Sequence, residues 1–318
     1  MSNSSFTLPT PDGTDVHVHR WLPDGDVRAV VHLAHGMAEH GARYAHVAAA
    51  LNERGYAVYA NDHRGHGLTA ATEDDLGFFA EDRGWARVLD DLYRVNRRVT
   101  DDHPGVPVYL LGHSMGSFLA QQYLFTFPAT IRGLVLSGTN LYRASDVEKA
   151  ALLARTEIQR QGPRGRSVVL ATAATGAYNR RFAPTRTDFD WLSRDPAQVD
   201  AYLADPRCGF LLTNRMWLDL FSGLRVIRQP HRLESVPSDL PIYAFSGEEC
   251  AVGEYGKGFH RLLDFYAEAG LHQVTSKLYP GGRHEMLNET NRDEVIDDLG
   301  RWLDDTTAAL DDAGQSVS

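Results

Sequence analysis

The sequence predicts an α/β fold with a mainly parallel sheet and helices on both of its faces. Short apolar runs alternate with segments of helical spacing from about residue 28 onward, and this alternation favours a parallel sheet. The run at residues 29–34 is apolar almost throughout, as expected of a strand buried on both faces. One run ends in Gly-x-Ser-x-Gly and passes directly into a segment that suits a helix.

The remaining elements follow in chain order. Residues 6–34 favour β structure, with turns expected at the Asp-Gly pairs 12–13 and 24–25. Further strands are expected at residues 56–60, 108–112, 131–138, 240–247 and 274–279. Helices are expected at residues 44–54, 85–99, 118–124, 255–269 and 291–304, followed by a polar, frayed tail at 306–318.

The alternation of strands and helices stops between residues 141 and 235. This stretch has helical patterns at residues 150–160, 171–176 and 210–227 but no convincing strand. We therefore expect a helical lid that is inserted into a core formed by residues 1–140 and 236–318. Most of its apolar side chains should serve packing, and a subset should line an apolar pocket against the sheet.

Composition and charge restrict the class of protein. The 318 residues are 43 % hydrophobic, which suits one large α/β domain with an insertion. A net charge of -10, without a Lys/Arg cluster, argues against nucleic acid as a partner. Cys208 and Cys250 are too few for a disulfide framework. With no signal peptide and no apolar run of about 20 residues, we expect a cytoplasmic protein without stable membrane insertion; its oligomeric state stays open.

Ser114 is the candidate nucleophile because of its place between strand and helix. A Gly-x-Ser-x-Gly at such a junction is typical of a nucleophile elbow, a sharp turn that exposes the serine at the edge of the sheet. Gly112 and Gly116 relieve the crowding of that turn because they carry no Cβ. The following helix would place free N–H groups near a developing negative charge.

Two histidine-containing segments precede the elbow. His35-Gly36 follows a buried strand, where this kind of fold builds half of an oxyanion hole; the donor would be the backbone N–H of Met37. Histidines and an aspartate also gather at residues 61–69. They lack the distant Cys/His partners of a zinc site, so we expect a polar turn there, with no metal and no cofactor.

These motifs, taken together, closely resemble the bacterial lysophospholipase and monoacylglycerol lipase branch of the α/β-hydrolases. The resemblance runs from about residue 6 to about residue 304. It rests on the segments at residues 35–40, 62–67, 112–116, 191–195, 205–210 and 279–285. The resemblance implies an eight-stranded sheet under a lid, Ser114 as nucleophile, His284 as base, and an oxyanion hole formed by the N–H groups of Met37 and Met115.

His284 also fits the chemistry that a serine nucleophile requires. A serine attacks only when a base takes its proton. His284 lies downstream of Ser114, after the last expected strand and in a glycine-rich loop, which is the chain order of this kind of fold.

One position departs from the resemblance. The branch usually has Gly-Asp-x-Asp-Pro-Val-Gly before its third catalytic loop, whereas residues 247–253 here read Gly-Glu-Glu-Cys-Ala-Val-Gly. The acid of the triad would therefore fall on Cys250, as a thiol or as a thiolate paired with His284. Alternatively, Glu249 or Glu248 reaches His284, or the site has no third member.

Three functions remain open at this point. The first is hydrolysis of a small-molecule ester or thioester with an apolar acyl group, through an acyl-enzyme on Ser114. The second is acyl transfer or lactone formation from the same acyl-enzyme, because a weakened acid slows water activation and favours a bound acceptor. The third is a binding protein that has kept the pocket without catalysis.

Overall fold

The computed structural model describes residues 2–315, which build one eight-stranded sheet in the order β1-β2-β4-β3-β5-β6-β7-β8. β1 and β2 are antiparallel to their neighbours, and the strands from β4 to β8 are parallel. The predicted fold class is thereby confirmed. The strands are β1 Ser2–Pro9, β2 Asp15–Leu22, β3 Ala29–Ala34, β4 Tyr56–Asn61, β5 Val108–His113, β6 Gly133–Ser137, β7 Ile242–Gly247 and β8 Val274–Tyr279.

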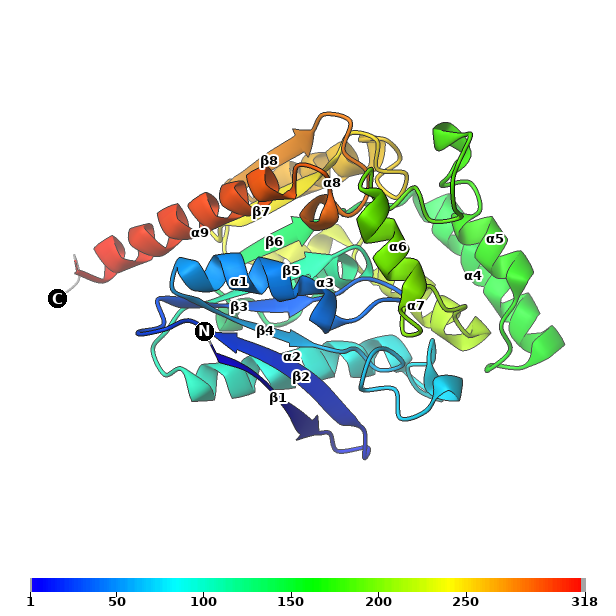
Figure 1. The fold of residues 1–318 in the computed structure, drawn as a ribbon, viewed down its shortest axis with the longest axis horizontal. Helices are drawn as coiled ribbons and strands as arrows, with labels where there is room; N and C mark the ends of the chain where they lie inside the picture. Colours follow the sequence, from blue (N-terminus) through cyan, green and yellow to red (C-terminus); the bar gives the residue numbers. More distant parts are fainter. Residues whose placement is uncertain (1, 316–318) are drawn as a thin grey trace.

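Helices cover both faces of the sheet (Figure 1). α1 and α9 pack their apolar residues on one face, whereas α2, α3 and α8 pack on the other. The helices are α1 Ala45–Glu53, α2 Gly84–Asp102, α3 Met115–Thr126, α4 Ala144–Gln161, α5 Val168–Thr175, α6 Pro196–Ala204, α7 Asn214–Val226, α8 Lys257–Glu268 and α9 Arg292–Gln315.

The segment between β6 and β7 contains α4, α5, α6 and α7 and, within the described chain, no strand. Figure 1 shows these helices gathered at the end of the sheet where the parallel strands finish. Several contacts tie the segment to the loops at that end: the amide of Gly209 and the hydroxyl of Tyr202 both donate to the carbonyl of Ala38, at 3.0 and 2.9 Å. The insertion therefore lies over the loops that follow the strands.

The C-terminal helix is longer than the sequence pattern indicates. The expected frayed tail from residue 306 is wrong as far as residue 315, since α9 continues to Gln315; residues 316–318 lie outside the described part. Tertiary packing explains the difference, because Leu303 and Thr307 are buried and the Thr307 hydroxyl lies 3.0 Å from the Tyr109 hydroxyl of β5. Among residues 2–315, no helix combines the length and the apolar character needed to cross a membrane.

Candidate active site

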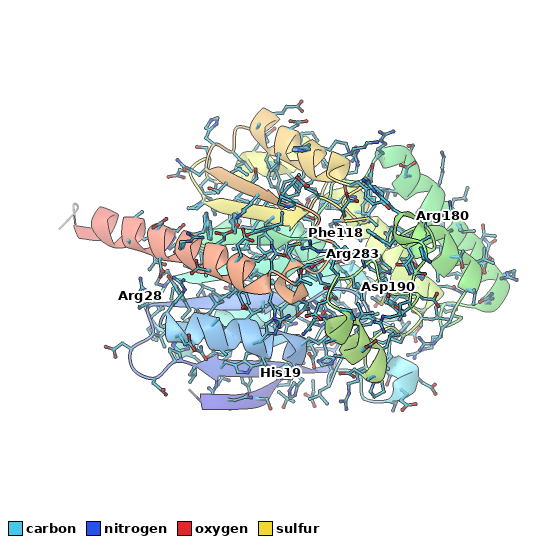
Figure 2. The ribbon with its side chains drawn as sticks, turned by 45° about the horizontal axis from the view of Figure 1, so that its top comes forward. His19, Arg28, Phe118, Arg180, Asp190 and Arg283 are labelled. Carbon is cyan, nitrogen blue, oxygen red and sulfur yellow. The ribbon has the colours of Figure 1, made fainter. Side chains whose placement is uncertain are left out.

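The predicted site residues meet at one edge of the sheet. Ser114 follows β5, Cys250 follows β7, His284 follows β8, and Met37 lies just beyond β3. Because the carboxyl ends of parallel strands share an edge, loops far apart in the sequence converge there. Figure 2 shows Arg283, the neighbour of His284, close to Asp190 of the insertion, and its guanidinium donates to the Asp190 carbonyl.

The turn at Ser114 has the backbone conformation of a nucleophile elbow. Ser114 adopts φ 51° and ψ -117°, a positive φ that costs free energy for a residue with a side chain. The flanking positions accept only glycine. A Cβ on Gly112 would lie 2.4 Å from the Gly116 carbonyl oxygen, and one on Gly116 would lie 2.0 Å from that of Ala34. Close packing of β3, β5 and α3 therefore holds the serine in place.

Ser114, His284 and Cys250 form a continuous chain of contacts. His284 Nε2 lies 2.9 Å from Ser114 Oγ, and His284 Nδ1 lies 3.2 Å from Cys250 Sγ. The amide of Gly253 donates to the same sulfur at 3.3 Å. In the tautomer with its proton on Nδ1, His284 donates a hydrogen bond to the sulfur, and the lone pair on Nε2 faces the serine hydroxyl. A general base needs this tautomer.

The two alternative acids point elsewhere. Glu249 forms an ion pair with Arg181 of the insertion, with Nε and Oε2 2.8 Å apart. Glu248 is exposed to solvent. Backbone hydrogen bonds from Glu248 to Tyr279 and from Glu249 to Gly282 fix the path of this loop. Cys250 is fully buried and is the member of the three that the structure brings to His284.

Burial determines the protonation of the His284–Cys250 pair. It lowers the pKa of His284 well below its ordinary value, and the neighbouring His113 adds to this, while Glu285 opposes it. Burial likewise raises the pKa of the Cys250 thiol, although the Gly253 amide acts in the opposite direction. Both groups are therefore neutral near pH 7, which favours the thiol over the thiolate.

The loop after β3 lies directly against the serine. A Cβ on Gly36 would lie 3.3 Å from the Ser114 Cβ. The Gly36 amide donates to a carboxylate oxygen of Glu39 at 2.5 Å, which fixes the loop from behind. The amides of Met37 and Met115 have no acceptor among the described residues, and both residues line the cavity beside Ser114.

A cavity of about 710 Å³ opens from Ser114 into the insertion. Its volume lies within the range of pockets for small molecules. The ring of Trp191 lies 5.2 Å from that of His284 and so covers the base. Apolar side chains of α4, α5 and α7 form a further part of the wall: Val147, Ala150, Leu153, Leu170, Ala171, Trp217, Leu220, Phe221 and Leu224.

The histidines of residues 61–69 brace the site through backbone hydrogen bonds. The His63 amide donates to His35 Nε2 at 2.9 Å, and the ring of His63 lies 4.1 Å from that of His35. Elsewhere, ligand atoms of His40, Asp205 and Cys208 lie within 4.8 Å of one another. This trio has donors that suit a divalent metal, but His40 and Asp205 already pair with each other at 2.8 Å.

Sequence reasoning missed a buried ionic cluster behind the site. Glu39, Arg43 and Glu285 are each nearly inaccessible to solvent, and Arg43 bridges the two carboxylates. Two of the three residues lie within the quoted motif segments, but nothing in those segments marks charged residues as buried together. Burial next to an apolar cavity is a property of the assembled loops.

The fold and the elbow define this chain as a serine hydrolase of the α/β-hydrolase class. A family model described as "Serine aminopeptidase, S33" matches residues 25–291, and the chain belongs to that family. The relatives confirm the predicted branch. The monoacylglycerol lipase of Mycolicibacterium smegmatis is 31 % identical over 283 residues, with 89 % of this chain and 90 % of the relative covered. The human monoglyceride lipase is 27 % identical over 309 residues, with 95 % and 90 % covered.

A solved structure is similar over nearly the whole chain. It is a thermostable carboxyl esterase from Bacillus coagulans in complex with glycerol, with a TM-score of 0.88 and 29 % identity. The alignment covers 96 % of this chain and 99 % of that chain. These relatives support an enzyme that acts as a serine ester hydrolase.

Proposed function

We propose that this protein hydrolyses carboxylic esters with one apolar acyl chain, of the monoacylglycerol or lysophospholipid kind, through an acyl-enzyme on Ser114. The observation that carries the proposal is the 2.9 Å contact between His284 Nε2 and Ser114 Oγ in the wall of a cavity lined mostly by apolar side chains. An ester with a polar head and an apolar chain matches a cavity whose wall carries polar groups around Ser114 and mostly apolar side chains elsewhere.

The reaction proceeds in two halves. Ser114 Oγ attacks the ester carbonyl while His284 Nε2 takes the hydroxyl proton. The resulting oxyanion accepts hydrogen bonds from the amides of Met37 and Met115, each worth roughly 3 kcal/mol in comparable enzymes. His284 then gives its proton to the leaving alcohol, and the acyl group stays on Ser114. Water, deprotonated by His284, releases the fatty acid and regenerates the serine.

The insertion acts as the lid in this proposal, and residues 1–140 and 236–318 act as the core. The helices and loops of the insertion supply most of the apolar side chains that line the cavity, so the lid selects the acyl group while the core performs the chemistry. Cys250 takes the acid position, where it orients His284 without supplying a negative charge.

A fluorophosphonate probe tests the proposal directly. Intact-mass and peptide analysis should find the probe on Ser114, and Ser114→Ala should abolish both labelling and the hydrolysis of a medium-chain monoacylglycerol. No labelling of the folded protein would contradict the proposal and would favour a binding protein that has kept the pocket. Thermal unfolding of the native chain and of Ser114→Ala serves as the folding control.

A second candidate function follows from the thiol at the acid position. A neutral partner stabilises the imidazolium less than a carboxylate does, so hydrolysis of the acyl-enzyme is slowed. An alcohol or amine held beside Ser114 then competes with water, giving acyl transfer or a lactone. Product analysis with a hydroxyacyl ester or thioester decides between the two functions. Free acid as the sole product across several acceptors would eliminate transfer.

A further inference from the structure

Three charged side chains form a buried cluster behind the oxyanion loop and the base. Arg43 donates through Nη1 and Nη2 to the two carboxylate oxygens of Glu285, both at 2.8 Å, and also to Glu39 at 2.5 Å. The exposed fractions of the side chains are 11 % for Arg43, 2 % for Glu39 and 6 % for Glu285. The cluster is therefore almost fully removed from water.

The cluster carries one excess negative charge. Two carboxylates share a single guanidinium, and the other recorded donors are neutral: the Tyr44 hydroxyl and Gly36 amide for Glu39, and the Asn288 amide for Glu285. Arg43 keeps the carboxylate ionised: although burial opposes it, the charge and hydrogen bonds of Arg43 lower the pKa of Glu285 to about 2. An excess charge in a water-poor site acts strongly on any cation that forms nearby.

The catalytic cycle forms such a cation beside the cluster. Glu285 is the chain neighbour of His284, and both line the cavity together with Glu39. His284 becomes an imidazolium each time it takes the proton of Ser114 or of water. We propose that the excess charge of the Glu39–Arg43–Glu285 cluster stabilises the His284 imidazolium and so performs part of the task that a triad carboxylate performs in a Ser-His-Asp site. This inference rests on the proposed function.

The other groups around His284 do not supply that charge. Cys250 is buried and neutral, and His113, whose ring lies 4.9 Å away, has its pKa lowered by burial. Trp191 and Ser114 are uncharged neighbours of the ring. Glu285 and Glu39 do not contact the reacting atoms. They are positioning residues whose charge acts on the imidazolium of His284.

The first test is the pH dependence of ester hydrolysis in Glu285→Gln, a change that keeps the shape of the side chain and removes its charge. The acid limb of kcat/KM, which reports the pKa of His284 in the free enzyme, should move about 1–2 pH units lower, as expected for one unit charge acting at an effective dielectric constant of about 20. The plateau of kcat should fall about 3- to 10-fold because a weaker base transfers the proton less readily.

Asp91→Asn is the matched control. Asp91 is a buried residue of α2 that forms a bidentate pair with Arg64, and neither residue lines the cavity. It therefore reproduces the loss of a buried Arg–carboxylate pair without changing the charge near His284. The acid limb of this variant should stay in place. If the role of Glu285 were purely structural, the acid limb of Glu285→Gln would stay in place, as in Asp91→Asn.

A measurement on His284 itself separates this inference from the proposed function. In Cys250→Asp the pKa of His284 should be higher, so that it can be followed by NMR. Adding Glu285→Gln to this variant should lower that pKa by about 1–2 units, the same amount as expected for the acid limb, because Coulomb energies add. This titration needs no substrate, so it decides the inference even if Ser114 fails to react with the probe.

Glu39→Gln is a second variant that tests the same charge if Glu285→Gln does not fold. It removes the same excess charge from the other side of Arg43 and should move the acid limb in the same direction. If Glu285→Gln and Glu39→Gln both leave the acid limb and the NMR pKa of His284 unchanged while the proteins stay folded, the cluster supplies no charge to the base and the inference is overturned.

Discussion

The sulfur of Cys250 lies 3.2 Å from Nδ1 of His284, on the side of the imidazole that faces away from Ser114. A carboxylate at this place would orient the ring and stabilise its charged form. In the mechanism that we propose, the thiol of Cys250 retains the first task, since its sulfur accepts a weak hydrogen bond from Nδ1–H, and it lacks the second. Its pKa is raised by burial, so the thiolate is disfavoured as a substitute for the acid.

Replacing Cys250 by aspartate should therefore increase esterase activity. The gain is bounded by the ~10⁴-fold that separates a carboxylate from a neutral amide at this position in a serine protease. Cys250→Ala should lower activity, because it removes the acceptor that holds the Nδ1 proton. Steady-state rates on one activated ester, with far-UV circular dichroism as the folding control, measure both effects. Faster hydrolysis by Cys250→Ala than by the native chain would contradict this assignment.

Substitution of the neighbouring glutamates should matter little for catalysis. Glu249 pairs with Arg181, and Glu248 is exposed. Glu249→Gln removes one partly exposed ion pair, typically worth about 0–1 kcal/mol, whereas Glu248→Gln removes no ion pair that residues 2–315 form. Both variants should keep kcat within about twofold of the native chain. A large loss in either one, with Cys250→Ala silent, would identify that glutamate as the third member.

The pH–rate profile should have an acid limb well below the ordinary histidine value. Burial lowers the pKa of His284 far below 6.5, so the base stays neutral and active as the pH falls through that value. No rise in activity is expected between about pH 7 and 9, because burial raises the pKa of Cys250 above 9.0. The measurement is kcat/KM from well below pH 6.5 up to pH 9. A rise that is abolished by Cys250→Ala would instead indicate a thiolate.

Acid should destabilise the fold before the carboxylates titrate. Burial lowers the pKa of His32 and His66 to about 4 and that of His63 to about 3. An unfolded chain binds these protons near pH 6.5, whereas the folded chain does not, so the free energy of unfolding should fall as pH decreases from about 6.5 towards 4. Urea unfolding at several pH values tests this. His66→Gln should flatten the slope, and the exposed-site change His231→Gln should not.

The elbow should not tolerate a methyl group. A Cβ on Gly116 would lie 2.0 Å from the Ala34 carbonyl oxygen, a backbone atom that cannot move without shifting β3. We expect Gly116→Ala to lose nearly all activity and to unfold at a lower temperature. Gly105→Ala is the control for an added methyl group, because its Cβ would meet nothing within 4 Å, although its positive φ carries a small penalty. Normal activity of Gly116→Ala would contradict the packing described for β3 and α3.

The sequence predicted the architecture because its signals are local. The nearly continuous apolar runs at β3, β4 and β5 indicate strands buried on both faces, and their alternation with helices indicates the parallel order. Ser114 was identifiable because the glycines that its turn requires are two residues away on either side. The length of α9 was not predictable, since its continuation past residue 304 includes Thr307, which contacts Tyr109 of β5.

The partner of His284 was decided by the tertiary structure. Three candidates stand side by side at residues 248–250, and a shift of one residue along a loop sends the side chain in another direction. The hydrogen bonds from Glu249 to Gly282 and from Cys250 to Gly247 set that direction. Likewise, Arg43 and Glu285 lie 242 positions apart in the chain, so only the folded core brings their charges together in a buried site, where a single excess charge has a large effect.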